Sequence, residues 1–323
     1  MARRLEERLA EVHAIAGDPS PSALPVLRDA LRSKTGLLVG AAAAVVAEAE
    51  LGDLVEELPA AFARLLERPI ERDPGCRGKV ALVRALHKGD RWEEEVFARG
   101  VRHVQREPAF GGSVDTAAVL RGTCGIAYAH FNRSEAIDIL AELLADPEQA
   151  ARAGAAQGLG DSGRADAIPL LRFKALVGDP EPAVMSACFS ALLALAADSS
   201  LSFLARFLAP DRTEESAEVA ALALGESRLD AAFPLLRAWC DDGMPARRAQ
   251  VGYLALALLR LDPATDHLLG IVAGGDPGEA VAAASALATF RADPGLAERV
   301  LEAAGKQPDR KVAAEVRAAF APR

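Results

Sequence analysis

Apolar residues, mostly Ala, Leu and Val, gather in helix-length runs that alternate with short polar breaks along most of the chain. Each repeat of this pattern contains a helical run, a break with Gly, Asp or Ser, and a second helical run. The clearest examples are EQAARAGAAQGLGDSGRADAIPLLRFKAL, PAVMSACFSALLALAADSSLSFLARFLA, ESAEVAALALGESRLDAAFPLLRAWC and GEAVAAASALATFRADPGLAERVLEAA. Ala and Leu are strong helix formers, and the β-branched and aromatic runs typical of strands are missing. The pattern therefore predicts an all-α fold.

A leucine recurs at the same place in successive repeats, and its spacing of about 32 residues is typical of helix-pair solenoids. These leucines are Leu159, Leu192, Leu224, Leu256 and Leu287. One helix pair has too little apolar surface to fold alone, so neighbouring pairs must stack to bury a continuous core. Small residues such as Gly154 and Gly158 allow close helix approach, which must offset the low helix propensity of glycine.

We therefore expect a single α-solenoid over residues 1–323, with about nine antiparallel helix pairs and a closing helix over residues 310–321. The repeats in residues 1–114 are less regular and have longer joints, whereas residues 115–323 hold the regular repeats. Length alone would suggest about two domains. This estimate does not apply to a repeat array, which can form one long domain because each unit packs only on its neighbours.

The unit DP…ARAGAAQGLGDSGRADAIPLLRFKAL resembles the short HEAT-like repeat first recognised in phycobilisome lyase subunits. The resemblance is best over residues 146–304. It implies a right-handed α-solenoid whose second helices line the concave face. Because this family includes scaffolds, adaptors and a few enzymes, the resemblance indicates the fold rather than the function.

Composition and charge narrow the classes of partner. Hydrophobic residues make up 51% of the chain, which excludes general disorder, and the formal net charge is −9. An acidic protein gains nothing from counterion release, so the charge disfavours nucleic acid or an anionic membrane as the main partner. The N-terminal MARRLEERLAEV is charged throughout and the longest apolar run, LLVGAAAAVVA, is too short to span a bilayer. We expect a soluble cytoplasmic protein with a protein partner.

The stretch EPAFGGSVDTAAVLRG, residues 107–122, interrupts the repeat pattern. The segment before it, RWEEEVFARGVRHVQRE, predicts a helix that carries several basic residues on roughly one side. Two interpretations are open: a cationic pocket for an anionic group, or a solvated helix face followed by a longer joint. The Gly111-Gly112 pair predicts a flexible turn, and Ser113 or Asp115 is expected to cap the next helix. The predicted partner-binding residues are Trp92, Arg99, Arg102, His103, Arg106, Asp115 and Arg121.

The tryptophans and a set of recurring arginines are weaker candidates for binding a partner. Trp92 and Trp239 are the only tryptophans, and half-buried packing competes with a role as binding anchors. The arginines Arg28, Arg172 and Arg237 recur early in second helices, but most repeats lack them, so they indicate isolated surface contacts.

Catalytic motifs are scarce. The sequence contains no His-Glu pair, so the metal site of the HEAT-repeat hydroxylase that modifies a translation factor is not expected, and no cofactor is predicted. Cys124 and His130 are six residues apart on one predicted helix, so they point to different sides and do not predict a nucleophilic triad. None of the four cysteines forms a Cys-x-x-Cys pair, which disfavours a zinc site or a redox dithiol.

Three hypotheses follow. The favoured one is a non-catalytic protein-interaction scaffold or adaptor that uses the curved surface of the solenoid. The alternative is a lyase-like chaperone or enzyme that acts on a protein-attached tetrapyrrole, and it rests on the resemblance alone. A third is nucleic-acid binding through the patch from Arg99 to Arg106, which predicts binding that weakens sharply with salt. The sequence does not indicate an oligomeric state.

Overall fold

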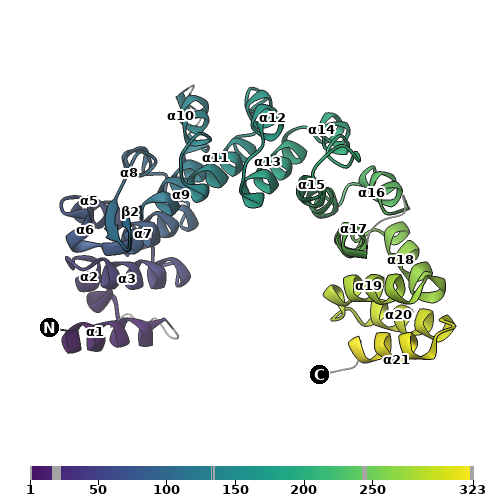
Figure 1. Ribbon diagram of the computed structural model, residues 1–323. Helices are drawn as coiled ribbons and strands as arrows, with labels where there is room; N and C mark the ends of the chain where they lie inside the picture. Colours follow the sequence, from purple (N-terminus) through teal and green to yellow (C-terminus); the bar gives the residue numbers. More distant parts are fainter. Residues whose placement is uncertain (1, 17–22, 132, 134, 242–245, 321–323) are drawn as a thin grey trace. The chain divides into compact units, whose positions relative to one another are not determined.

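The computed structural model describes residues 2–16, 23–131, 133, 135–241 and 246–320. Within these ranges the chain consists mainly of helices that follow one another through short connections (Figure 1). Contacts between residues group the helices into two compact units, Met1–Leu170 and Leu171–Arg323. The helix α12 (Ala167–Val177) spans the boundary between these units in the sequence.

In the first unit, the first helices of successive repeats stack in series, each on the next. They are α3 (Gly36–Glu48), α7 (Arg77–Lys88), α9 (Ala118–Tyr128) and α11 (Gln149–Asp161). The second helices α5 (Leu58–Leu66), α8 (Glu94–Gly100) and α10 (Glu135–Leu143) pack on α7, α9 and α11 respectively. Two N-terminal helices, α1 (Ala2–Ile15) and α2 (Leu24–Leu31), pack on α3. The joints contain the short helices α4 (Gly52–Val55) and α6 (Pro69–Arg72) and the 3₁₀ turn η2 (Pro74–Cys76).

The second unit repeats the same arrangement. Its first helices are α13 (Pro182–Leu195), α15 (Glu214–Glu226), α17 (Ala246–Leu259), α19 (Pro277–Leu287) and α21 (Arg310–Ala319), which stack in that order. Its second helices are α14 (Ala197–Ala205), α16 (Ala232–Asp241), α18 (Asp262–Gly274) and α20 (Pro294–Lys306), and the 3₁₀ turn η3 (Ala288–Phe290) follows α19. The predicted closing helix corresponds to α21, and its last predicted residue, Ala321, lies outside the described residues. Among the helices that the structure describes, none combines the length and apolarity needed to cross a bilayer.

The repeat register predicted from the leucines is confirmed. All five leucines are buried in first helices, with no more than 1% of their surface exposed. The small residues also act as expected, because a Cβ on Gly154 of α11 would collide with the backbone of Gly122 on α9. The all-α solenoid is thus the fold class, whereas its handedness and its continuity over residues 1–323 stay predictions.

One element departs from the expected all-α chain. Residues 106–115 form a β-hairpin of two antiparallel strands, β1 (Arg106–Ala109) and β2 (Gly112–Asp115), in which Glu107 faces Val114. Phe110 and Gly111 form the turn, and Gly111 adopts a positive φ of 85°, which glycine tolerates without strain. The longer joint before α9 therefore contains a β-hairpin, which the sequence analysis did not predict.

Candidate interaction surface

The first turn of α7 is held by a buried carboxylate just before it. Asp73 accepts hydrogen bonds from the backbone N–H groups of Gly78 and Lys79, at 2.8 and 2.9 Å, and from the Lys79 ammonium at 2.9 Å. Because the first N–H groups of a helix have no intrahelical partner and carry partial positive charge, this carboxylate stabilises the start of α7. Removing Asp73 or Lys79 would leave an uncompensated buried charge, so the pair fixes this segment against the helix.

Gln105 and Glu107 fasten the base of the hairpin to the same segment. The Gln105 amide donates to the Asp73 carbonyl oxygen at 2.9 Å and to Glu107 Oε1 at 2.6 Å. That Glu107 oxygen also accepts from the Gly75 N–H at 2.7 Å and from the Thr116 hydroxyl at 2.6 Å. The Thr116 hydrogen bond is the main reason that the pKa of Glu107 lies below its ordinary value. Glu107 is therefore an anion held in place by three donors.

Arg121 on α9 joins the other side of the hairpin to the next repeat. Its guanidinium donates to Asp115 at 2.7 Å and to both carboxylate oxygens of Asp146 at 2.8 and 2.9 Å. It also donates to the His103 carbonyl oxygen at 2.9 Å. Only 3% of the Arg121 side chain is exposed, so a partner docking on the surface cannot reach its charge. Arg121 positions the hairpin from within.

Asp115, at the end of β2, serves the same purpose. Its Oδ1 accepts from the backbone N–H groups of Gln105 and Ala117, at 3.1 and 2.9 Å, while Oδ2 takes the bond from Arg121. Burial raises the pKa of Asp115, but these hydrogen bonds outweigh burial, so the pKa lies below its ordinary value. The expected cap is present in part, because Asp115 receives the N–H of Ala117, which directly precedes α9.

The predicted basic side of a single helix is not present. The helix α8 ends at Gly100, so Arg99 lies on it, Arg102 follows it, and Arg106 lies on β1. The helix cannot continue because the backbone of Gln105 has other partners: its N–H donates to Asp115 and its C=O accepts from the Thr116 N–H. The expectation that these basic residues share one helical side was therefore wrong, although Arg99, Arg102 and Arg106 are all exposed.

The remaining predicted residues of this region pack locally. His103 is half-buried, its Nε2 lies 3.3 Å from Gln105 Oε1, and burial lowers its pKa. Trp92 is half-buried between His87 and His130, with ring centroids 5.3 and 4.4 Å away, and its indole N–H donates to Asp90 at 2.7 Å. Trp92 is thus part of an aromatic cluster, and its role as a binding anchor stays a prediction.

The outer part of the hairpin presents apolar side chains to solvent. Phe110, in the turn, has a relative exposure of 110%, so it makes no burying contact with the fold. Val104, before β1, and Val114, on β2, are also exposed. Arg102 and Arg106 lie within a few residues of these side chains and are exposed as well. The hairpin therefore combines a rigidly held base with an uncovered apolar and basic outer surface.

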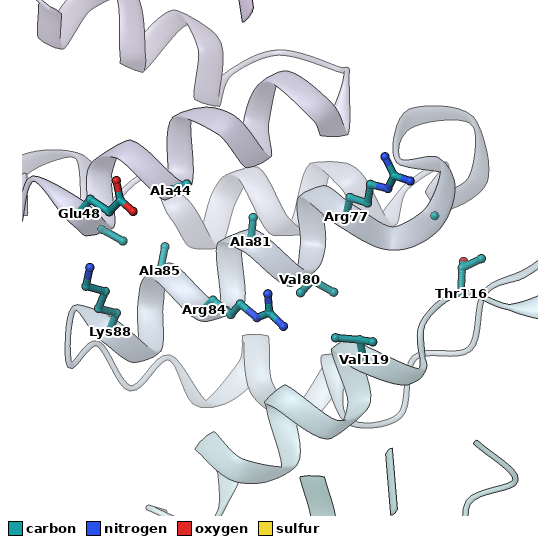
Figure 2. Close-up of a pocket in the computed structure, with 12 residues that line it drawn as sticks. Ala44, Glu48, Arg77, Val80, Ala81, Arg84, Ala85, Lys88, Thr116 and Val119 are labelled. Atoms are coloured by element: carbon teal, nitrogen blue, oxygen red, sulfur yellow. The ribbon is translucent and has the colours of Figure 1, made fainter. Parts of the chain in front are cut away.

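A groove beside the hairpin base was not predicted from the sequence. It encloses about 460 Å³ between α3, α7 and the start of α9, and we call it the α3–α7 groove (Figure 2). Its lining is mostly small apolar side chains with four charged groups. The lining residues are Ala44, Ala47, Glu48, Gly75, Arg77, Val80, Ala81, Arg84, Ala85, Lys88, Thr116 and Val119.

Three cations of this groove come from a single stripe of α7. Arg77, Arg84 and Lys88 are spaced by seven and four residues, which places them within about 40° of one another around the helix. Figure 2 shows Arg77 and Thr116 toward one end of the groove and Lys88 toward the other, with Arg84 between them. The spacing of these three cations can be read from the sequence. The part of the lining that comes from α3 and Val119 is visible only in the fold.

The four cysteine thiols have raised pKa values. All four cysteines are free thiols, and burial raises the pKa of Cys76, Cys188 and Cys240 to about 12 and that of Cys124 well above its ordinary value. Such thiols remain protonated near neutral pH and are poor nucleophiles. Within the described ranges no group of three or more His, Cys, Asp or Glu side chains is placed to hold a metal ion.

The arginines that recur in second helices make local contacts. Arg28 pairs with Glu57 at 2.6 Å, and Arg237 lies 3.5 Å from Asp241. Arg172 donates to the carbonyl oxygen and the hydroxyl of Ser199, at 3.1 and 3.0 Å. These are separate contacts on separate repeats, which agrees with the interpretation from sequence.

A comparison with protein families identifies HEAT repeats in part of the chain. Residues 137–224, from α10 to α15, match the family of HEAT repeats. A search of curated proteins found no match. A solved structure of human deoxyhypusine hydroxylase in complex with glycerol is 19% identical in sequence, with a TM-score of 0.31, and the match covers 84% of this chain and 98% of that chain. The family match is to HEAT repeats in general, so the phycobilisome lyase type stays a prediction.

Proposed function

We propose that this HEAT-like repeat protein is a non-catalytic scaffold or adaptor that binds a protein partner through the β-hairpin of residues 106–115 and the exposed residues around it. The observation that carries the proposal is Phe110, a large aromatic side chain left wholly in solvent at the tip of the hairpin. Burying such a side chain is worth about 1.5–3 kcal/mol, which the folded chain alone does not gain. Exposed aromatic side chains are typical anchors of protein interfaces.

The support beneath the hairpin makes it suitable as a recognition element. Glu107 is held by three donors and Arg121 by two carboxylates, so the base of the hairpin is fixed before any partner arrives. A surface that is already ordered loses less conformational entropy on binding. In this proposal Asp115 and Arg121 position the hairpin, whereas Phe110 makes contact with the partner.

The basic residues of the region define the charge of the partner. Arg102, before β1, and Arg106, at the start of β1, are exposed near the base of the hairpin, and Arg99 lies on α8, 3.7 Å from Glu95. Exposed cations at the rim of an interface contribute mainly to association rate and specificity. We therefore infer a protein partner that has an apolar pocket for Phe110 and acidic residues around it, and we propose Trp92 and His103 as peripheral members of the surface.

Site-specific cross-linking tests the proposal. A photo-reactive amino acid at position 110 should capture one protein from an extract of the native cell, whereas the same group at Phe173 should not. Phe173 is a matched control because it lies on α12 and is 68% exposed. The captured protein, once purified, should bind the unmodified chain and bind Phe110→Ser at least tenfold more weakly. Equal binding to Phe110→Ser and Phe173→Ser would remove the hairpin from the interface.

The lyase-like alternative makes a different prediction. It rests on the resemblance of the repeats, and it requires the chain to recognise a tetrapyrrole. Mixing the protein with a bilin or haem should shift the absorption spectrum of the pigment if the alternative holds, and the scaffold proposal expects no shift.

A further inference from the structure

The α3–α7 groove has the composition of a binding site for a negatively charged segment. Three exposed cations, Arg77, Arg84 and Lys88, border it, against a single anion, Glu48. None of these cations makes an ion pair with a carboxylate of the described residues. Arg84 and Lys88 are also one turn apart on α7, where like charges repel each other. The groove therefore carries a local excess of positive charge on a chain of net charge −9, and this charge favours binding of an external anion.

The floor of the groove is apolar and consists of small side chains. Ala44 and Ala47 of α3 and Ala81 and Ala85 of α7 line it, and Val119 of α9 lies at one side. Side chains this small let another helix approach closely, because little projects above the backbone. A ligand that occupies the groove should therefore bring its own apolar side chains.

The spacing of the cations favours an extended ligand over a small one. Arg77 and Lys88 are eleven residues apart on α7, which corresponds to about 16 Å along the helix axis. A single carboxylate or phosphate can neutralise one or two of the three cations, whereas carboxylates on successive turns of a helix can reach all three. A nucleic-acid strand would supply enough charge, but it would not use the alanine floor and it would be repelled by the acidic chain as a whole.

We propose that the α3–α7 groove binds an acidic amphipathic helix of a protein partner. Its apolar side chains lie on the floor around Ala81, and its carboxylates pair with Arg77, Arg84 and Lys88. This site goes beyond the proposed function of the hairpin, because it is built from other residues and recognises a helix by charge and period rather than by an aromatic anchor. Helix-in-groove recognition of this kind is read through residues spaced by three, four and seven.

The test uses the full chain and a synthetic helical peptide with a fluorescent label. The peptide has about 18 residues, glutamates at positions p, p+4, p+7 and p+11, and leucines on the adjoining face. A control peptide of the same composition distributes the glutamates around the helix. Fluorescence anisotropy should show at least tenfold tighter binding of the first peptide. Equal binding of the two peptides, or no binding of either, would overturn the proposal.

Variants of the chain locate the site. Arg84→Glu combined with Lys88→Glu should weaken peptide binding at least tenfold, and Ala81→Phe, which fills the floor, should do the same without changing charge. The matched control combines Arg310→Glu with Lys311→Glu on α21, where both side chains are exposed, and should leave binding within twofold. Melting curves should show that all variants remain folded. Equal losses in the two double variants would indicate bulk charge and contradict the proposal.

Two further measurements separate this inference from the others. Phe110→Ser should bind the peptide as tightly as the parent does. The hairpin proposal and the groove proposal can therefore fail independently of each other. A single-stranded DNA of equal charge should bind at least tenfold more weakly than the peptide. Tighter binding of the DNA would assign the cations to nucleic acid and overturn the helix proposal.

Discussion

Arg121 and Asp146 form a two-point ion pair that ties α9 to the residues preceding α11, with N–O distances of 2.8 and 2.9 Å. The same guanidinium also binds Asp115 at the end of β2. The planar guanidinium of Arg121 and the planar carboxylate of Asp146 can form two parallel hydrogen bonds. Such charged, two-point pairs are stronger than hydrogen bonds between neutral groups. One side chain thereby sets the position of the hairpin relative to two successive repeats.

Removing this guanidinium should be costly for stability. We expect Arg121→Met to lower the free energy of unfolding by about 3–5 kcal/mol, because the buried Asp115 and the partly buried Asp146 would both lose their cation. Urea denaturation measures the change. Arg99→Met, which removes an exposed pair with Glu95, is the control and should change stability by less than about 1 kcal/mol. Similar free energies of unfolding for the two variants would show that the contacts of Arg121 stabilise the fold no more than an exposed ion pair does.

The helical repeats could be predicted from the sequence because their signals are local and repeated. The leucine period gave the register, and glycines such as Gly154 indicated where helices approach closely. The hairpin escaped prediction because its strands have four residues each and its stability depends on distant partners. The contact between Glu107 and Gly75 joins residues 32 positions apart, and no local propensity encodes it.

The candidate sites could be predicted only in part. The exposed arginines Arg102 and Arg106 were identified, but on a helix that does not extend that far. Asp115 and Arg121 were predicted as partner-binding residues, but both side chains are buried and bind each other within the fold. The α3–α7 groove could not be predicted without the fold, because its lining combines residues of α3, α7 and Val119 of α9.

Stability should fall in mildly acidic solution. Burial lowers the pKa of His87 and His103 in the folded state, and the neighbouring His130 lowers that of His87 further. As the pH falls below about 6.5, these histidines are therefore protonated in the unfolded chain before they are protonated in the folded one. Each histidine then lowers the free energy of unfolding by up to about 1.4 kcal/mol per pH unit. The urea midpoint should therefore decrease from pH 7.5 to pH 5.5.

The histidine variants provide the control for this pH dependence. Replacing His87 and His103 together by Gln should reduce the slope between pH 7.5 and pH 5.5, and the remaining slope comes from His267, whose pKa is also lowered by burial. Asp115 and Glu107 have lowered pKa values, so their contribution is lost only below about pH 4 and does not interfere. An unchanged slope in the double variant would assign the acid sensitivity to other groups.

The stacked core should be intolerant of charge. Leu192 of α13 has no exposed surface, so we expect Leu192→Asp to lower the free energy of unfolding by about 3–5 kcal/mol through burial of an unpaired carboxylate. Leu176→Asp on α12 is the control, since Leu176 is well exposed, and its effect should stay near 0.5 kcal/mol. Circular dichroism during thermal melting distinguishes the two. A Leu192→Asp protein as stable as the parent would contradict the repeat register.

The basic residues beside the hairpin should affect binding without affecting the fold. Arg102→Glu combined with Arg106→Glu replaces two exposed cations, neither of which contributes an ion pair within the described residues, so helix content and melting temperature should match the parent. Binding of the protein cross-linked at position 110 should be abolished, because the reversed charges repel its acidic rim. Surface plasmon resonance at two salt concentrations measures both effects: the parent should associate more slowly at high salt, and the variant should give no binding signal at physiological salt. Unaltered capture by this variant would show that Arg102 and Arg106 lie outside the interface.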